Sequence, residues 1–251
     1  MWDRHPFQCN IFKTLLMYHQ CLPLPTQFPN QQKENYIQKK YIFNPINGWM
    51  DPKNHPCKVL YEMSRPYIKS FDLALDIGCR FGEFTYFSQK DFSHTFCFDP
   101  VVYEDFCTNA DLSKSTHYKC ALGNEFETIK MYGGCHHNSL DDGKQRTFLK
   151  STKHYAQSVP LDSFLLTTKY SNIGLIKIDV EGFEFNVLRG GWNTIINKNP
   201  VIIIEQNSIR LNNQDNNAAL NFLLKKGYSI KGTSRNSANV ITDYVLACDL
   251  T

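Results

Sequence analysis

The stretch IGLIKIDVEGFEFNVLRGG, residues 173–191, carries the most information about the fold. Its first part is a run of apolar, mostly branched residues, which is typical of a strand buried on both faces of a parallel sheet. Gly182 then turns the chain into a segment with helical spacing, and a Gly-Gly pair interrupts that segment. Three acids crowd around the turn, namely Asp179, Glu181 and Glu184. A buried strand that ends in acids before a helix predicts a binding site at the carboxyl end of the strand.

The same alternation of strand and helix runs through most of the chain. Strands are expected at residues 72–78, 94–100, 116–123, 173–180 and 200–206, with helices between them. Residues 124–160 carry weaker β segments around a polar, Gly-rich loop, and residues 228–232 and 239–250 should close as a strand pair. This order predicts an α/β fold with a mainly parallel sheet, helices on both faces and an antiparallel strand near one edge.

Composition fits one compact domain with a short extra region. The chain has 251 residues, of which 42% are hydrophobic and 20% charged, and a net charge of +3. We expect an α/β domain over residues 57–251 and an irregular, proline-rich extension over residues 1–56 that packs on it. The small net charge does not argue for a nucleic-acid or membrane partner. Neither a membrane-spanning run nor a signal peptide is recognisable, so we expect a cytoplasmic protein.

The cysteines do not form a recognisable site. There are nine of them, scattered along the chain, and no C-x-x-C pair occurs. Zinc and redox sites usually bring two thiols close together in sequence, so neither is predicted. Several cysteines lie within apolar runs and should be buried, which suits a reducing, intracellular setting.

A first candidate site lies in LALDIGCRFGEF, residues 73–84. It places Asp-x-Gly-x-x-x-Gly, from Asp76 to Gly82, between the end of a strand and a helix. The spacing matches neither the G-x-G-x-x-G of dinucleotide sites nor a P-loop. Asp99 ends the next strand, where an acid can accept hydrogen bonds from both ribose hydroxyls. An ordinary turn with a capping acid is the alternative, but the pair of acids favours an adenosine-bearing cation, S-adenosylmethionine.

The second candidate site is the group of acids after residue 178. Glu181 and Glu184 could simply favour the start of a helix. Three acids at one strand end exceed that need, and their repulsion should raise some pKa values unless a proton or cation is shared. They could supply a general base or a clamp on substrate hydroxyls, while a divalent metal is another solution that the spacing does not demand. Lys177 should reach an acid nearby, and Glu205 could either join the site or serve the structure.

With these segments in place, the chain resembles the FkbM family of S-adenosylmethionine-dependent methyltransferases. The matching pieces are LDIGCRFGEFT, FDP, CALGN, PLDSF, LIKIDVEGFEFNVLRGG and VIIIE, in the order of the family. The resemblance covers about residues 71–206 and is most specific at KIDVEGFEFNVLRGG. It implies the class I methyltransferase fold, which is Rossmann-like and doubly wound, with a mainly parallel seven-stranded sheet that has an antiparallel edge strand.

The resemblance also implies roles for individual residues. The residues implied to bind the cofactor are Asp76, Ile77, Gly78, Cys79, Gly82, Asp99, Pro100, Ala121 and Leu122, and the catalytic acids are Asp179, Glu181 and Glu184. The methionine end of the cofactor would lie at the first of these and the adenine at the last two of the cofactor set. Two departures stand out, because the family commonly has Ala-Asn at Cys79-Arg80 and Glu at Asp99. Arg80 could reach the cofactor carboxylate or an anionic acceptor.

The expected activity is methylation of a hydroxyl on a small-molecule, sugar or glycan acceptor. Asp179 or Glu181 is the first candidate for the base, with His136 and His137 as alternatives. A rival hypothesis is RNA 2′-O-methylation, supported by a modest basic stretch that comprises Lys144, Arg146, Lys150, Lys153 and His154. A second rival is a binding module of the same fold that lacks turnover.

Overall fold

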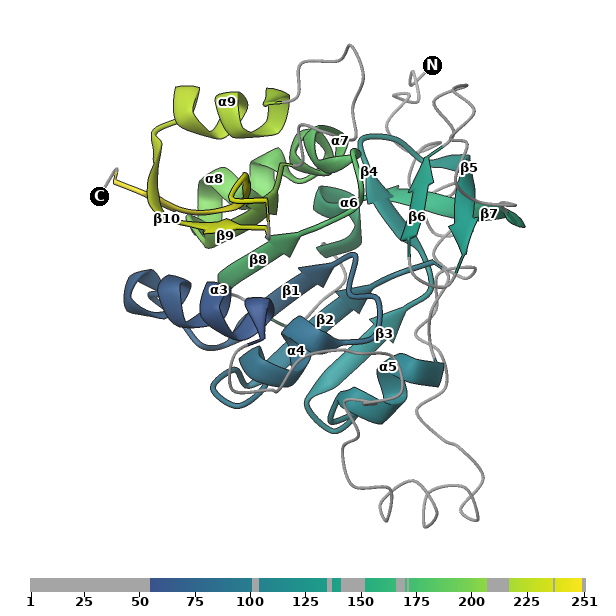
Figure 1. Ribbon diagram of the computed structural model, residues 1–251, viewed down its shortest axis with the longest axis horizontal. Helices are drawn as coiled ribbons and strands as arrows, with labels where there is room; N and C mark the ends of the chain where they lie inside the picture. Colours follow the sequence, from purple (N-terminus) through teal and green to yellow (C-terminus); the bar gives the residue numbers. More distant parts are fainter. Residues whose placement is uncertain are drawn as a thin grey trace, which may run out of the picture.

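The computed structural model describes residues 55–100, 104–134, 137–140, 152–165, 170, 172–206, 217–236 and 238–249. These residues form two β-sheets, and helices cover both faces of the larger one (Figure 1). The proline-rich extension predicted for residues 1–56 lies outside the described residues except for its last two positions.

The larger sheet has seven strands in the order β10-β11-β9-β8-β1-β2-β3. Their bounds are β1 Leu73–Ile77, β2 His94–Phe98, β3 Ser115–Tyr118, β8 Ile173–Ile178, β9 Val201–Glu205, β10 Tyr228–Arg235 and β11 Ile241–Cys248. The neighbours from β9 to β3 pair in parallel, whereas β11 pairs antiparallel with both β9 and β10. The predicted α/β fold with a mainly parallel sheet and an antiparallel strand near its edge is therefore confirmed.

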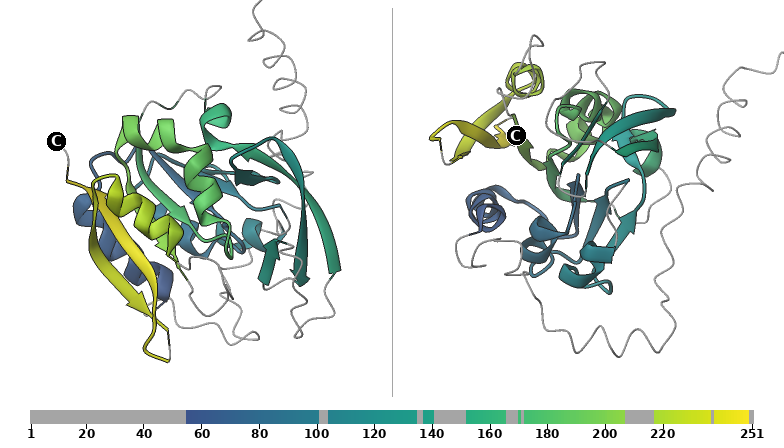
Figure 2. Two further views of the ribbon diagram at one scale, coloured as in Figure 1. Left: turned by 90° about the horizontal axis from the view of Figure 1, so that it is seen from above. Right: turned by 45° about the vertical axis from the view of Figure 1, so that its right-hand side comes forward.

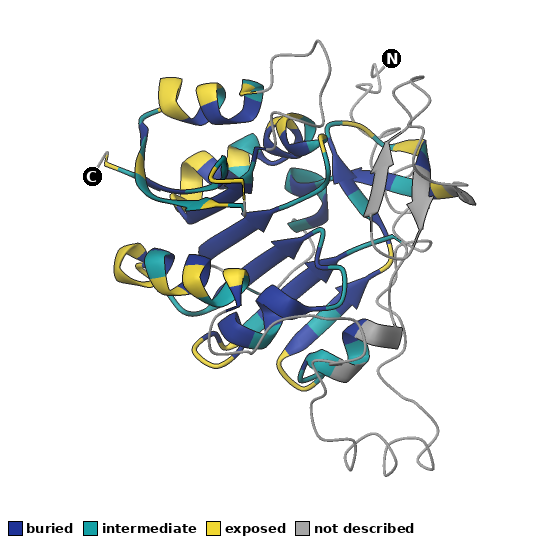
Figure 3. Ribbon diagram, viewed as in Figure 1, coloured by how far each residue is buried: buried dark blue, intermediate teal, exposed yellow. Residues whose placement is uncertain are grey.

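The central strands are buried on both faces, as their near-continuous apolar sequences predict. Along β1, Leu73, Leu75 and Ile77 belong to one hydrophobic cluster, whereas Ala74 belongs to another. Because side chains alternate across a strand, these clusters mark the two faces of the sheet. Figure 3 shows the result, with the central strands dark blue throughout.

Two helical layers provide the cover. The layer on the face of Leu75 contains α6 Leu161–Leu165, α7 Glu184–Gly190, α8 Trp192–Lys198 and α9 Ala218–Lys225. The opposite layer contains α3 Pro56–Ser64 with the short helix η2 Arg65–Tyr67, α4 Glu83–Ser88 and α5 Glu104–Asn109. The predicted break at Gly191 separates α7 from α8. Among the described residues, no helix has both the length and the apolar character to span a membrane.

The second sheet is formed by the region predicted to hold weaker β segments. Its order is β4-β7-β5-β6, with β4 Ala121–Gly123, β5 Glu127–Gly134, β6 His137–Leu140 and β7 Thr152–Pro160. Figures 1 and 2 show that it stands beside the carboxyl ends of β1, β2 and β8. It therefore adds a wall to the edge of the large sheet where the acids were predicted to gather.

One predicted strand was wrong in its extent. Residues 116–123 were expected to form a single strand, but β3 ends at Tyr118 and β4 begins at Ala121 in the other sheet. Between them, the Cys120 N–H donates a hydrogen bond to the Tyr118 carbonyl at 2.9 Å, and the Cys120 side chain is fully buried. This tight turn redirects the chain, so that Ala121 pairs with Ser158 of β7.

Candidate active site

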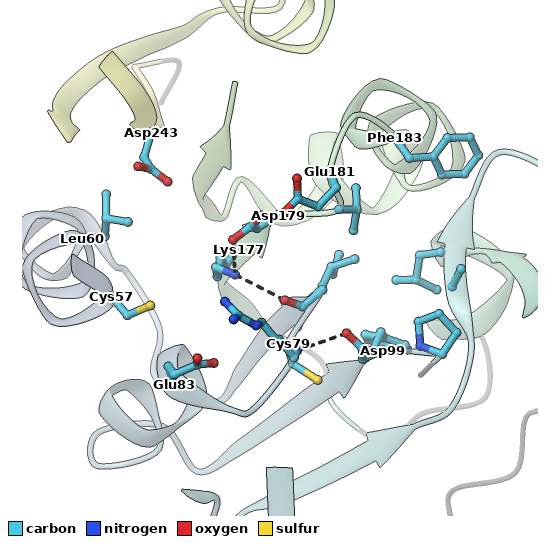
Figure 4. Close-up of a pocket in the computed structure, with 18 of the residues that line it drawn as sticks. Cys57, Leu60, Cys79, Glu83, Asp99, Lys177, Asp179, Glu181, Phe183 and Asp243 are labelled. Carbon is cyan, nitrogen blue, oxygen red and sulfur yellow. Dashed lines mark hydrogen bonds and ion pairs between the residues drawn. The ribbon is translucent and has the colours of Figure 1, made fainter. Parts of the chain in front are cut away.

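A cavity of about 230 Å³ lies at the carboxyl ends of β1, β2 and β8. Residues of β4 and β5 from the second sheet and of α3 from the sequence start also line it. Figure 4 shows Lys177, Asp179 and Glu181 on one side of the cavity, and Glu83, Cys79 and Asp99 on the opposite side. The structure thus brings the two candidate sites predicted from the sequence to one cavity.

The turn after β1 is fixed by contact with the neighbouring strand ends. The Gly78 N–H donates to the Phe98 carbonyl at 2.8 Å, and Gly78 has a φ of 79°. A Cβ atom placed on Gly78 would lie 1.9 Å from the carbonyl oxygen of Asp179. Only glycine fits here, because both the left-handed conformation and the close approach exclude a side chain. Gly82 is also left-handed but packs against Phe106, away from the cavity lining.

Asp76 lies beneath the cavity, not in its wall. The side chain is 0% exposed, and the Thr85 hydroxyl donates to its Oδ2 at 2.6 Å. Its Oδ1 lies 3.7 Å from the Nζ atom of Lys177. Burial raises the pKa of Asp76, and the Lys177 ammonium and the Thr85 hydroxyl partly offset that rise. Asp76 is therefore part of a buried polar network.

Lys177 connects the ends of β1 and β8. Its Nζ atom lies 3.1 Å from Asp179 Oδ2 and donates to the Gly78 carbonyl at 3.5 Å. Burial opposes the charge on Lys177, but attraction to Asp179 and Asp76 raises the pKa of the ammonium above its ordinary value. The prediction that Lys177 reaches an acid is confirmed. Its positive charge favours an ionised Asp179.

Asp179 lies within a group of acids that also contains Glu181 and Glu205. Their carboxylate oxygens all lie within 4.8 Å of one another. Glu205 hydrogen bonds with Asp179, and burial followed by the charge of Asp179 raises the pKa of Glu205 to about 10. A carboxyl group with such a pKa holds its proton at neutral pH, so the pair can share a proton without a bound cation. Asp243 pairs with Glu205 in the β-ladder, and burial raises its pKa as well.

Glu184 has a different place from the one that a catalytic acid would need. Its carboxylate is buried and accepts hydrogen bonds from the Val180 and Gly182 N–H groups at 3.2 and 2.9 Å. It does not line the cavity, whereas Asp179 and Glu181 do. Burial raises the pKa of Glu184 to about 7, although those two N–H groups act in the opposite direction. The side chain thus shapes the loop that carries the other two acids.

The residues expected around a nucleoside lie along one wall. Ile77, Cys79, Asp99, Pro100, Ala121 and Leu122 all line the cavity. Asp99 Oδ2 accepts a hydrogen bond from the Arg80 N–H at 3.2 Å, which ties the turn after β1 to the end of β2. Ile129 and Met131 of β5 extend the apolar part of this wall, and Ala121 packs against them.

Several lining residues were not predicted from the sequence. They include His55, Cys57 and Leu60 near the start of α3, Glu83 at the start of α4, Phe183, and Asp243 of β11. Burial, and then the charge of Arg80, lowers the pKa of His55 to about 4, so this imidazole is neutral at pH 7. An acid at the first position of a helix was the available signal for Glu83, and Asp243 carried no motif.

The alternative residues cannot be compared with this site. His136, Lys144, Arg146 and Lys150 lie outside the described residues, and only the backbone is described for His137, Lys153 and His154.

A mainly parallel seven-stranded sheet with one antiparallel strand, and an acid-lined cavity at its central strand ends, defines a class of protein: the S-adenosylmethionine-dependent class I methyltransferase fold. Residues 76–230 match the methyltransferase FkbM domain. The chain belongs to the FkbM methyltransferase family.

Solved structures agree with this assignment at the level of the fold. Methyltransferase FkbM from Methylobacillus flagellatus is 17% identical over 78% of this chain and 50% of that chain, with a TM-score of 0.52. An rRNA methylase from Streptococcus thermophilus is 9% identical over 79% of this chain and 98% of that chain, with a TM-score of 0.47. An O-methyltransferase from Bacillus cereus in complex with SAH is 12% identical over 91% of this chain and 94% of that chain, with a TM-score of 0.46.

The match to the Methylobacillus protein spans only half of that chain's length. No curated protein sequence matches the chain.

Proposed function

We propose that the protein is an S-adenosylmethionine-dependent O-methyltransferase that acts on a hydroxyl group of a sugar, a glycan or a related small molecule. The observation that carries the proposal is the single cavity in which Asp99 faces Asp179 and Glu181 across the ends of β1, β2 and β8. One side suits a nucleoside and the other suits a hydroxylated acceptor.

The donor side fits the chemistry of S-adenosylmethionine, which supplies an activated methyl group on a sulfonium. Asp99 lies in the cavity wall, where its carboxylate can accept hydrogen bonds from ribose hydroxyls. Ala121, Leu122, Ile129 and Met131 offer the apolar surface that an adenine ring needs. Acids outnumber cations among the described lining residues, which suits a ligand with a positive centre.

Asp179 is the base in this proposal. Lys177, at 3.1 Å, keeps its carboxylate ionised, and protonated Glu205 orients it through a hydrogen bond. A neutral alcohol must lose its proton as the new bond forms, and an ionised carboxylate in the cavity wall can accept that proton. Glu181, on the same loop, can hold a second hydroxyl of the acceptor. The mechanism needs no metal ion, because the acids already share a proton and a lysine.

The acceptor side also bears on the RNA hypothesis. Asp179, Glu181 and Asp243 present negative charge where the acceptor would lie. Such a surface repels phosphate groups and suits a polyol, because carboxylates accept hydrogen bonds from hydroxyls. We therefore favour a neutral hydroxylated acceptor over a nucleic acid.

A product-mass screen tests the proposal. The purified chain is incubated with S-adenosylmethionine and panels of sugars, glycans, lipids and RNAs, and each product is analysed for the added mass of a methyl group in place of hydrogen. Methylation of a sugar or glycan is the expected result, and a parallel calorimetric titration checks donor binding. Binding without turnover on any acceptor would favour a silent module, and methylation confined to RNA would refute the assignment of the acceptor.

A further inference from the structure

The donor has an amino-acid end as well as a nucleoside, and the strand-end acid is not available to bind it. Asp76 is 0% exposed and is already bonded to the Thr85 hydroxyl and close to Lys177. Lys177, in turn, contacts Asp179 and the Gly78 carbonyl. A zwitterionic ligand end therefore needs another anion and another cation in the cavity wall.

Arg80 and Glu83 provide this pair. Both line the cavity, and both lie on the turn between β1 and α4. Burial raises the pKa of the Glu83 carboxyl, and the Arg80 guanidinium partly offsets this rise, as expected for opposite charges that face each other. The Cζ atom of Arg80 lies 4.6 Å from the ring centroid of Phe81, which supports the guanidinium plane. His55 cannot serve as the cation, because its pKa of about 4 leaves it neutral.

The position of the pair matches the order of groups in the donor. Figure 4 shows Cys79 between Asp99 and Glu83 along one wall of the cavity. The Arg80 N–H donates to Asp99 Oδ2 at 3.2 Å, so the same residue links the ribose position to the far end of this wall. Arg80 has a φ of 47°, a conformation that few non-glycine residues adopt. A ligand with its ribose at Asp99 would extend past Cys79 and bring its other end to Arg80 and Glu83.

We propose that Arg80 and Glu83 bind the amino-acid end of the methyl donor, with the guanidinium on the α-carboxylate and the Glu83 carboxylate on the α-ammonium. This inference rests on the proposed function, because it assumes that the nucleoside lies at Asp99. It assigns Arg80 to the donor and not to an anionic acceptor. Guanidinium groups suit carboxylates because their parallel N–H groups match the two oxygens.

The test compares ligands that differ only at this end. Calorimetry on the full chain measures the affinity for S-adenosylhomocysteine, which has the whole amino-acid end, and for 5′-methylthioadenosine, which has none. Arg80→Ala and Glu83→Gln should each weaken S-adenosylhomocysteine binding by about 10-fold to 100-fold and change 5′-methylthioadenosine binding by less than about 2-fold. Arg189→Ala, which removes an exposed arginine of α7, is the matched control and should change neither.

A third ligand separates the two roles. Decarboxylated S-adenosylmethionine keeps the ammonium and lacks the carboxylate, so Arg80→Ala should no longer weaken its binding while Glu83→Gln still should. Equal losses for all ligands, or no loss for any, would overturn the inference. Slower methyl transfer with unchanged donor affinity would instead assign Arg80 to the acceptor.

Two precautions keep the outcome interpretable. Arg80→Lys, which keeps the charge but loses the two-point contact, gives the same comparison if Arg80→Ala does not fold. If the unmodified chain binds 5′-methylthioadenosine and S-adenosylhomocysteine, the donor site stands whatever the variants do. If it binds neither, the proposed function fails together with this inference.

Discussion

Asp76 and Asp179 follow the same pattern in sequence but occupy different environments. Each terminates or follows a neighbouring parallel strand, and each lies near the same ammonium group of Lys177. The side chain of Asp76 is 0% exposed, whereas that of Asp179 is 33% exposed. A motif that places an acid at a strand end therefore does not fix its role. The face of the sheet to which the side chain points decides whether it serves the fold or the cavity.

Removal of Asp179 should have the largest effect on activity. In the proposed function, Asp179→Ala removes the base, so methyl transfer should fall about a thousand-fold. Affinity for S-adenosylhomocysteine should change by less than about 3-fold, because this product does not include the acceptor. Initial rates and calorimetry measure the two quantities. A variant that loses donor binding along with activity would show that Asp179 serves the donor side.

Loss of the charge on Asp76 should act on stability instead. Asp76→Asn leaves Lys177 with one carboxylate fewer in a buried site, so the free energy of unfolding should fall by about 3 kcal/mol. Asp179→Asn should cost about 1 kcal/mol, because solvent reaches that carboxylate. Urea unfolding gives both values. Asp249→Asn, which breaks the exposed pair with Lys231, is the control and should have little effect. Equal costs at residues 76 and 179 would remove the distinction drawn here.

A side chain at Gly78 should disturb both strand ends at once. Gly78→Ala forces an unfavourable conformation and a clash with the Asp179 carbonyl, so it should cost about 2 kcal/mol and weaken donor binding. Gly232→Ala is the matched control, because its new Cβ would meet only the sulfur of Met63, which lies on a flexible side chain. Chemical unfolding and calorimetry on both variants test this. Equal tolerance at residues 78 and 232 would contradict the proposed contact between the strand ends.

The smallest expected effect concerns the pH dependence of stability. Glu184 has a folded pKa of about 7 against an ordinary value of 4.5, so the folded state binds its proton more tightly. Its contribution to stability is present below pH 4.5 and is lost as the pH rises through about 7. Glu184→Gln should remove up to about 3 kcal/mol of this decline between those limits.

Unfolding measured at pH 5 and pH 8 tests the Glu184 prediction. Glu62→Gln, an exposed glutamate of α3, serves as the control. A decline of the same size in wild type and Glu184→Gln would show that Glu184 is not the group responsible.

The sequence predicted the parts of this molecule that depend on neighbours along the chain. The strands that end at Ile77, Phe98 and Ile178 follow from apolar runs and glycine turns, and their carboxyl ends meet because parallel strands share an edge. The split between β3 and β4 was missed because the turn at Cys120 lacks glycine and proline.

The candidate site was predicted less completely. His55, Cys57 and Asp243 reach the cavity from segments far apart in sequence, and no spacing rule connects such positions. The structural place of Glu184 depends on where two backbone N–H groups point, which residue types alone do not reveal. Asp76 illustrates the same limit, because a strand-end acid looks alike in sequence whether it faces the cavity or the helices behind it.

The excess of acids in the cavity wall has a consequence for turnover. Five acids and two cations line it among the described residues. In the proposed reaction the ligand enters with a sulfonium charge and leaves as a neutral thioether, so the wall attracts the incoming form more strongly than the spent one. Added salt should therefore narrow the gap between the two affinities. Electrostatics of this kind would clear the product without any movement of the chain.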